Sequence, residues 1–316
     1  MTLFLLQAVP VFGIVLHPDG EPNLATWTDR PDANVVGRWS SNASFAVIAP
    51  NWIITTRHQN TSPATVTING VSYTCHYNTT AWTGGPTGNA DIRLIRLTKA
   101  DGNDADLTHY ARPYEDSNEV EKEIVIGGYG KGRGTSLMTD GIVYGYAWYG
   151  SANTVRRWGQ NIVDGDGISS DDTYTSDVIE ADFDGIGDDN YRPYECIIAF
   201  WDSGGGWFIK DSNEWKVAGL SRGVEHGGAN WFRNNQDPNS LDPDYFDAVR
   251  ISSYAQWIKQ IIQVDFAEFA VFANNWQRTD CNSTNYWCDG ADFIPHDGTV
   301  DWDDLTVFAD YWLTSW

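Results

Sequence analysis

The chain has 316 residues, of which 43 are acidic and 20 are basic, so its formal net charge is −23. This excess of acidic residues argues against binding to nucleic acid or to an anionic membrane surface, because both kinds of binding require clustered Lys and Arg. A hydrophobic fraction of 41 % is enough for packed cores and excludes a wholly disordered chain. The length favours about two domains, and the abundant Gly, Trp, Asn and Asp indicate short strands and turns.

Residues 3–16 form an almost wholly apolar run. The run is too short to span a bilayer as a helix, and Pro10 interrupts it. It is either the remnant of a secretory signal, although a basic region is missing before it, or a buried strand. We therefore treat residues 1–34 as an N-terminal segment, and we predict no membrane span. Secretion, or display at the cell surface, agrees with four Asn-X-Ser/Thr sequences, at Asn42, Asn60, Asn78 and Asn282.

Several blocks between residues 45 and 262 have the apolar pattern of strands. They comprise residues 45–54, broken by an Ala-Pro-Asn turn; 91–97, opened by Asp91; 124–130, ending in a Gly turn; 217–223; and 245–262, a strand followed by a helix. Two further segments carry polar residues of catalytic type, namely His58 after the first block and Asp202-Ser203-Gly204-Gly205 before the fourth. Taken singly, each of these is an ordinary structural feature.

Taken in order, the blocks resemble the chymotrypsin-like (trypsin-fold) serine peptidases. The matching segments are Thr55-Thr56-Arg57-His58, Asp91-Ile92-Arg93-Leu94-Ile95, Gly128-Tyr129-Gly130, Asp202-Ser203-Gly204-Gly205, Ser221-Arg222-Gly223 and residues 247–262. The chain order His, Asp, Ser is that of this family and differs from the order in subtilisins and α/β-hydrolases. The resemblance implies a mainly β domain over residues 35–262, folded as two six-stranded antiparallel β-barrels.

The resemblance also implies roles for individual residues. Ser203 would be the nucleophile, His58 the general base and Asp91 the group that orients the imidazole. The backbone amides of Trp201 and Ser203 would form the oxyanion hole. The substrate would be a polypeptide bound by Ile197, Ser221, Arg222 and Gly223, and catalysis would need no cofactor. Because Ile197 stands where trypsin-like members carry an acid, we expect an apolar or small side chain in the specificity pocket.

Three departures from the family pattern leave alternatives open. Trp201 stands where the family has Gly, so its amide is either turned away or held in place by a local change. Val35-Val36-Gly37 weakly matches the motif whose new N-terminal amine pairs, in this family, with the acid before the Ser, here Asp202. Cys75 and Cys196 either pair or are both free and buried, and the free state is the commoner one.

Residues 164–190 contain ten acidic residues and no basic one. We interpret them as an insertion before the nucleophile loop. They form either a solvated acidic loop or a Ca²⁺ site built from Asp164, Asp166, Asp182 and Asp184.

Residues 264–276 and 300–312 repeat one pattern, with an offset of 36 and six of thirteen positions identical. Apolar residues at helical spacing predict two short amphipathic helices that pack on each other. Cys281 and Cys288 lie between the copies, close enough for a disulfide in an oxidising compartment. Asp297, Asp301 and Asp304 follow the second half of an EF-hand-type Ca²⁺ loop, with helix capping as the alternative.

This arrangement resembles a dockerin module, especially the dockerin-like tails of secreted planctomycete proteins. It implies a small helical module over residues 263–316, a Ca²⁺ ion and a cohesin-like or cell-surface partner. Phe293 and Pro295 occupy loop positions that normally donate side-chain oxygens, so at most one weakly bound ion is expected. The sequence as a whole predicts a serine endopeptidase. The alternatives are a catalytically inactive binding protein on a peptidase fold, and a calcium-binding surface or docking protein.

Overall fold

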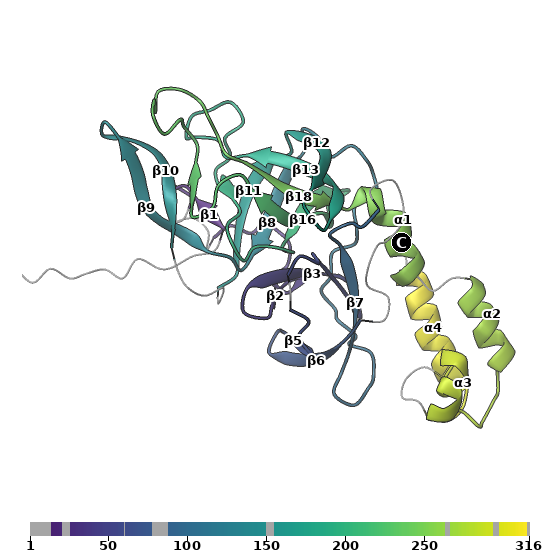
Figure 1. The fold of residues 1–316 in the computed structure, drawn as a ribbon. Coiled ribbons are helices and arrows are strands. Elements are labelled where there is room, and N and C mark those ends of the chain that lie inside the picture. The colour runs from purple at the N-terminus through teal and green to yellow at the C-terminus, as the bar shows by residue number, and fades with distance from the viewer. Residues whose placement is uncertain are drawn as a thin grey trace, which may run out of the picture.

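The computed structural model describes residues 14–20, 26–59, 61–77, 88–149, 155–262, 266–292 and 297–314. As predicted, the chain is mainly β, with two large antiparallel sheets and most of its helix near the C-terminus (Figure 1). Residues 3–13 of the predicted signal remnant, and also Asn60 and Asn78, lie outside the described residues.

Six strands form the first sheet, in the order β2-β3-β4-β7-β6-β5. Their bounds are β2 Val36–Trp39, β3 Ala43–Ala49, β4 Trp52–Thr55, β5 Thr65–Ile68, β6 Val71–His76 and β7 Arg93–Thr98, with a 3-10 turn, η2 Ala33–Val35, before β2. The edge strands β2 and β5 lie close together, so the sheet is a nearly closed barrel. Apolar side chains such as Phe45, Ile53 and Leu97 are fully buried in its interior. This sheet agrees with the first predicted barrel.

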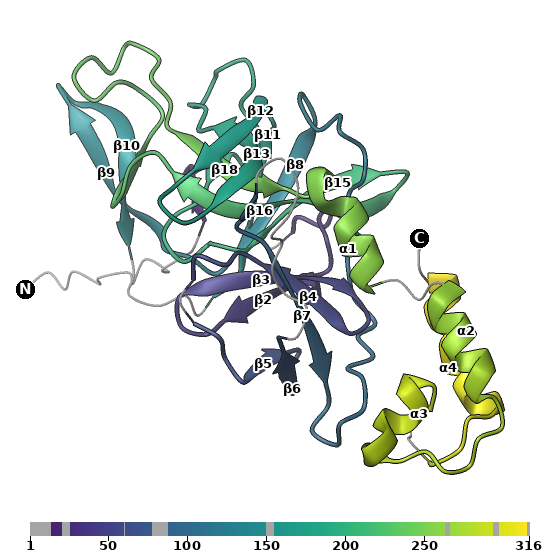
Figure 2. The same cartoon turned by 45° about the vertical axis from the view of Figure 1, so that its right-hand side comes forward.

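The second sheet has seven strands, in the order β11-β8-β15-β16-β18-β13-β12, one more than the six predicted for the second barrel. The strands are β8 Glu123–Gly128, β11 Arg157–Ile162, β12 Gly165–Ser170, β13 Thr175–Asp182, β15 Gly206–Asp211, β16 Glu214–Val224 and β18 Tyr245–Arg250. A separate three-stranded sheet consists of β9 Gly132–Thr139, β10 Ile142–Tyr149 and β17 Ala229–Trp231. Figure 2 shows the second sheet stacked above the first barrel.

The acidic segment is part of this second sheet, and the prediction of an inserted loop over residues 164–190 is wrong for most of its length. Strand β13 pairs with β12 on one side and with β18 on the other. Its apolar residues Val178, Ile179 and Ala181 are fully buried, whereas Asp177 and Asp182 are partly exposed. Ile179 and Ala181 share the face that packs into the core, whereas Asp182 lies on the opposite face of the strand and is partly exposed.

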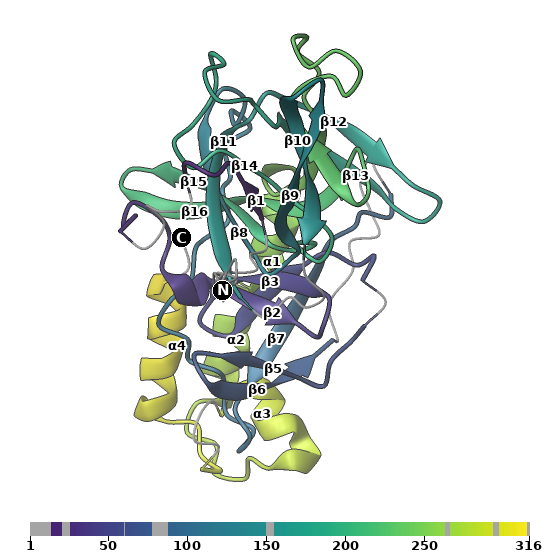
Figure 3. The same ribbon diagram turned by 90° about the vertical axis from the view of Figure 1, so that its left-hand side faces the viewer.

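The first described residues also belong to the second sheet's core. Strand β1, Val15–Leu16, pairs antiparallel with β14, Cys196–Ile197 (Figure 3). Ile14, Val15 and Leu16 are fully buried among the core residues of this half. The described part of the apolar run is thus a buried strand, and the domain begins before the predicted residue 35.

The helices follow the predicted pattern. After β18 the chain forms a 3-10 turn, η3 Ser252–Tyr254, and then α1 Ala255–Ile262. The two repeat copies form α2 Phe266–Asn275 and α4 Trp302–Thr314, which contact each other through the stacked rings of Phe272 and Phe308. Between them lie η4 Ser283–Asn285 and the short α3 Tyr286–Gly290, and this group sits beside the sheets (Figures 1 and 2). Within the described residues, none of the helices has the length and apolar character needed to cross a membrane.

Candidate active site

The predicted catalytic residues come from three distant parts of the chain and meet between the two large sheets. His58 follows β4 and Asp91 precedes β7 in the first barrel, whereas Ser203 precedes β15 of the second sheet. His58 Nδ1 lies 2.6 Å from Asp91 Oδ2, and His58 Nε2 lies 2.8 Å from Ser203 Oγ. The backbone N–H of Ser44 on β3 donates to the carbonyl of Ser203 at 2.8 Å, which joins the two halves at this point.

The carboxylate of Asp91 is fully buried and well supplied with donors. Its Oδ1 accepts hydrogen bonds from the backbone N–H groups of Arg57 and His58, at 2.6 and 2.8 Å. Its Oδ2 is left to face the imidazole of His58. A carboxylate held in this way fixes the ring so that Nδ1 carries the proton and Nε2 can accept one from Ser203.

The loop before Ser203 contains a tight turn closed by the backbone N–H of Asp202, which donates to the carbonyl of Ala199 at 3.1 Å. Trp201, the third residue of this turn, has a φ of 80°, the value of a type II turn at a position usually held by Gly. Trp201 therefore adopts the backbone conformation that Gly would take. Among the described residues, no protein acceptor faces the N–H of Trp201 or of Ser203, so both amides remain available.

Asp202 is fully buried beneath the nucleophile loop. Its Oδ1 accepts from the N–H of Gly130 at 2.6 Å, and its Oδ2 accepts from the N–H groups of Ala199 and Ile14, at 3.0 and 3.3 Å. Burial raises the pKa of Asp202 to about 6, although these hydrogen bonds act in the opposite direction. Glycine is required at position 130, because a Cβ there would collide with this carboxylate.

The assignment of the N-terminal motif to Val35-Val36-Gly37 is wrong. Val35 ends η2 and Val36 begins β2, on the first barrel. The residue whose backbone N–H reaches Asp202 is Ile14, followed by Val15. An apolar Ile-Val pair at the edge of the apolar run was the available signal, but the same run also fits a secretory signal.

A cavity of about 460 Å³ opens beside Ser203 and His58. Its other lining residues are Asn42, Gln59, Thr61, Ile198, Ala199, Phe200, Trp201, Arg222, Gly223 and Val224. Arg222 and Gly223 were predicted to bind substrate, and both line the cavity. Arg222 also pairs with Asp247 at 3.0 Å and with Asp171 at 3.2 Å, so its charge is already compensated.

Two other predicted substrate contacts do not line the cavity. Ile197 is fully buried and pairs with Val15 in the two-stranded sheet, and the next residue, Ile198, takes its place at the cavity. Ser221 is also fully buried, and its hydroxyl accepts a hydrogen bond from the indole N–H of Trp207 at 3.1 Å. The residues that line the cavity are thus the neighbours, by one position, of the two predicted residues, because the sequence alone does not show which side chains face a cavity.

The three predicted Ca²⁺ ligands of the C-terminal loop take part in turn and cap contacts. Asp297 accepts from the N–H of Thr299 at 2.9 Å. Asp301 accepts from the N–H of Asp303, and Asp304 accepts in return from the N–H of Asp301, both at 2.8 Å, which is a reciprocal cap at the start of α4. These are the contacts of the capping alternative, and Ca²⁺ binding here stays a prediction. Phe293 and Pro295 lie outside the described residues.

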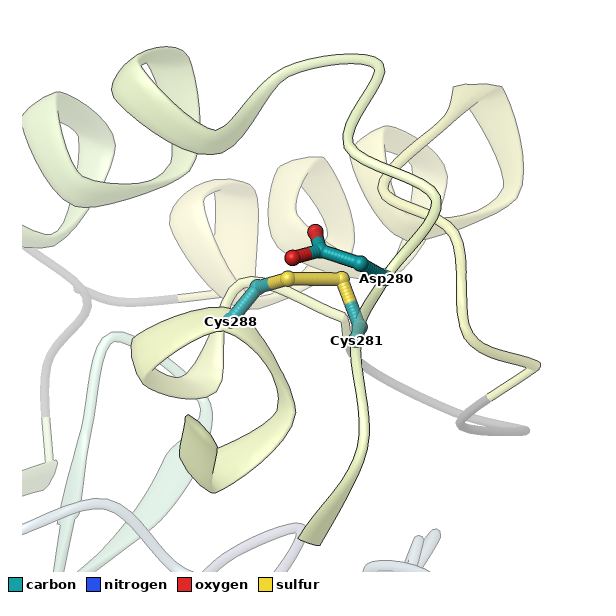
Figure 4. A group of neighbouring side chains, drawn as sticks. All are labelled: Asp280, Cys281 and Cys288. Carbon is teal, nitrogen blue, oxygen red and sulfur yellow. A yellow bond between two sulfur atoms is a disulfide. The ribbon is translucent and has the colours of Figure 1, made fainter. Parts of the chain in front are cut away.

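The structure contains the disulfide between Cys281 and Cys288 (Figure 4). Asp280 lies next to it, so three metal-ligating side chains are close together. Because the two sulfurs are bonded to each other, they offer no thiolate to a metal ion. Cys75 and Cys196 are both free and buried, and burial raises the pKa of each thiol, to about 11 for Cys75.

A second group of metal-ligating side chains consists of Glu225, His226 and Asp244. His226 Nδ1 and Asp244 Oδ1 lie 2.7 Å apart, and Asp244 Oδ2 accepts from the N–H of Trp231 at 2.8 Å. His226 Nδ1 and both carboxylate oxygens of Asp244 therefore have partners within the protein, as in an ordinary structural contact.

The four acids proposed as a Ca²⁺ clip do not form one group. Asp166 pairs with Arg250, whereas Asp164 accepts from the N–H of Asp182 at 2.9 Å. Burial, and then the neighbouring carboxylates, raise the pKa of Asp182 to about 7 and that of Asp184 to about 6. Mutual repulsion of this kind is what a bound cation relieves, and Ca²⁺ binding within residues 164–190 stays a prediction.

No family model and no curated protein matches the sequence. Among solved structures, the chain is similar to the crystal structure of the Rv3671c protease in its inactive form. The two share 13 % sequence identity and a TM-score of 0.42, over 80 % of this chain and 99 % of the other.

Proposed function

We propose that the chain is a serine endopeptidase that cleaves peptide bonds through an acyl-enzyme on Ser203. The observation that carries this proposal is the unbroken hydrogen-bond series from Asp91 through His58 to Ser203, at 2.6 and 2.8 Å. A serine hydroxyl is a weak nucleophile until a base within hydrogen-bond distance takes its proton. His58 meets that requirement, and Asp91 fixes its tautomer.

The reaction follows from this arrangement. Ser203 Oγ attacks the scissile carbonyl carbon while its proton passes to His58 Nε2, and the carbonyl oxygen becomes an oxyanion. The free N–H groups of Trp201 and Ser203 would stabilise that oxyanion. Collapse of the intermediate expels the amine, which takes the proton from His58, and leaves an ester on Ser203. A water molecule activated by His58 then releases the acid and restores the hydroxyl.

The cavity beside Ser203 supports a preference for small or apolar side chains in the substrate. Ile198, Phe200 and Val224 supply apolar surface there, and none of the described residues that line the cavity is acidic.

The C-terminal helices belong to a second part of the proposal. The disulfide between Cys281 and Cys288 supports a secreted or cell-surface location, because such bonds persist in oxidising compartments. The resemblance to dockerins then suggests that α2 and α4 attach the peptidase to a cohesin-like or cell-surface partner.

The test is intact-mass analysis after exposure to a fluorophosphonate probe, which phosphonylates an activated serine. We expect one adduct on the wild-type protein and none on Ser203→Ala or His58→Ala. Folding of each variant is checked by its melting temperature. A folded wild-type protein without an adduct, both with and without Ca²⁺, would contradict the proposal and favour a binding protein on this fold.

A further inference from the structure

Lys131 contacts both the peptide bond that precedes Trp201 and the indole ring of Trp201. We propose that Lys131, in the turn between β8 and β9, is a positioning residue that holds the Trp201 amide toward the oxyanion of the reaction. This inference rests on the proposed function. It explains how a Trp is accommodated where the resemblance leads us to expect Gly.

The first contact acts on the peptide bond between Phe200 and Trp201. The backbone N–H of Lys131 donates to the carbonyl of Phe200 at 2.9 Å. In a planar trans peptide the C=O and the following N–H point in opposite directions. Fixing the Phe200 carbonyl on the Lys131 side therefore directs the Trp201 N–H to the other side. A flip of this peptide would break the bond and withdraw the amide.

The second contact acts on the side chain. The ammonium of Lys131 lies 5.0 Å from the centroid of the Trp201 indole ring, within the range of a cation–π interaction. With φ at 80°, Trp201 occupies a conformation that bulky residues rarely adopt without support from their surroundings. The ammonium of Lys131 supplies such support. A change in the backbone of this turn would move the indole of Trp201 away from the ammonium and lose the contact.

Lys131 is itself held in place by its neighbours. The N–H of Gly130, one residue earlier, donates to Asp202 Oδ1 at 2.6 Å. The N–H of Tyr129 donates to Ser44 Oγ at 3.0 Å, and this hydroxyl lies 3.4 Å from the carbonyl of Trp201. Three successive residues of one turn thus contact the nucleophile loop directly or through Ser44. These hydrogen bonds fix the backbone of the turn that carries the Lys131 ammonium.

This arrangement makes the importance of the Lys131 side chain depend on Trp201. A Gly at position 201 adopts a positive φ without strain and has no ring for an ammonium to hold. Loss of the Lys131 side chain should therefore be harmful in the wild-type chain and almost harmless in Trp201→Gly.

The experiment measures the phosphonylation rate of Ser203 by a fluorophosphonate probe at saturating and at limiting concentration. Lys131→Met should lower the maximal rate about 5- to 30-fold, the range of a partly desolvated cation–π contact, and leave the half-saturating concentration unchanged. Lys131→Arg, which keeps the cation, should stay within about 3-fold of the wild type. In the Trp201→Gly background, Lys131→Met should cost less than about 2-fold.

A matched control is available in the second sheet. The ammonium of Lys210 lies 5.4 Å from the centroid of the Trp215 ring, so Lys210→Met removes the same kind of pair outside the residues that line the cavity. It should leave the phosphonylation rate unchanged. Melting temperatures show whether each variant is folded. If Lys131→Met does not fold, Lys131→Gln takes its place in the experiment.

Two outcomes overturn the inference while the proposed function stands. One is a Lys131→Met protein that reacts at the wild-type rate. The other is an equal loss in the wild-type and Trp201→Gly backgrounds, which would mean that the charge of Lys131 acts on the oxyanion directly. A folded wild-type protein that does not react at all contradicts the proposed function and removes this inference with it.

Discussion

The backbone N–H of Ile14 donates to Asp202 Oδ2 at 3.3 Å, although 188 residues separate the two along the chain. Asp202 immediately precedes Ser203, so the first described strand of the chain lies directly under the nucleophile loop. The carboxylate is fully buried, and its described hydrogen-bond donors are backbone amides. Amides stabilise a buried anion less than a cation does, which agrees with a pKa for Asp202 raised to about 6.

The first prediction concerns a chain cut so that Ile14 becomes its first residue. The new α-ammonium would attract the Asp202 carboxylate and lower its pKa, which removes the cost of burying the anion at neutral pH. We expect faster phosphonylation of Ser203 and a higher melting temperature at pH 7.5. The cut can be made at a protease site engineered to end at residue 13. A chain that begins at Gly13 displaces the amine and is the control. Equal rates for the intact chain and the chain beginning at Ile14 would contradict the prediction.

The second prediction concerns Asp91→Asn. The amide cannot hold the Nδ1–H tautomer as a carboxylate does, so His58 loses much of its capacity as a base. We expect the phosphonylation rate at Ser203 to fall about 10⁴-fold. The matched control is Asp104→Asn, which replaces another buried acid of the first barrel, paired with Arg96, and should leave the rate unchanged. A loss below about 10-fold in Asp91→Asn would be inconsistent with an orienting role for this carboxylate.

The third prediction concerns pH and Asp182, whose pKa is raised to about 7. Because this pKa lies above the unfolded value, the folded state binds more protons between about pH 4 and pH 7, and the group costs stability as pH rises through that window. Asp182→Asn removes this cost. The melting temperature of Asp182→Asn minus that of the wild type should therefore increase steadily from pH 4 to pH 7.5. A difference between the two that is constant with pH would contradict the prediction. Comparing differences matters because burial lowers the pKa of His17 to about 4, which acts in the opposite direction.

Much of the fold could be predicted because the alternation of apolar residues directly reflects burial. The pattern over residues 45–54 became β3 and β4, and that over 245–262 became β18 and α1. Strand β13 was missed because its acids suggested a solvated loop. Its alternate positions Ile179 and Ala181 are nevertheless fully buried. Net charge over a segment says little about a strand in which only one face meets water.

The site was predicted in part for a similar reason. The order along the chain of the segments that contain His58, Asp91 and Ser203 carried the resemblance, and the fold brings these residues together. Which side chain faces the cavity depends on the pairing of β14 with β1. In this pairing the side chain of Ile197 is buried in the core, and that of Ile198 lines the cavity. Such a pairing joins residues about 180 positions apart, which no local pattern reveals.

The fourth prediction tests the cavity wall through Ile198. Replacing it with Asp places a carboxylate in an otherwise apolar part of the cavity, which should favour a basic side chain of the substrate. In a peptide library, we expect the wild-type protein to cleave after small or apolar residues. The Ile198→Asp protein should shift toward Lys and Arg by at least about 10-fold. Ile197→Asp is not a valid comparison, because it would bury a charge in the core. An unchanged cleavage pattern in a folded Ile198→Asp protein would show that this wall does not select the substrate.

The fifth prediction separates the C-terminal helices from the catalytic site. The disulfide joins residues with a sequence separation of 7, and closing so short a loop stabilises its surroundings by about 2 kcal/mol in the chain-entropy account. A Cys281→Ser, Cys288→Ser protein should therefore show faster amide hydrogen exchange in α2 and α4, with an unchanged phosphonylation rate at Ser203. Dithiothreitol should have the same effect on the wild type and none on the double variant, because Cys75 and Cys196 are free. If the rate at Ser203 fell together with the protection of the helices, these helices would have to support the active site, and they would no longer qualify as a separate docking module.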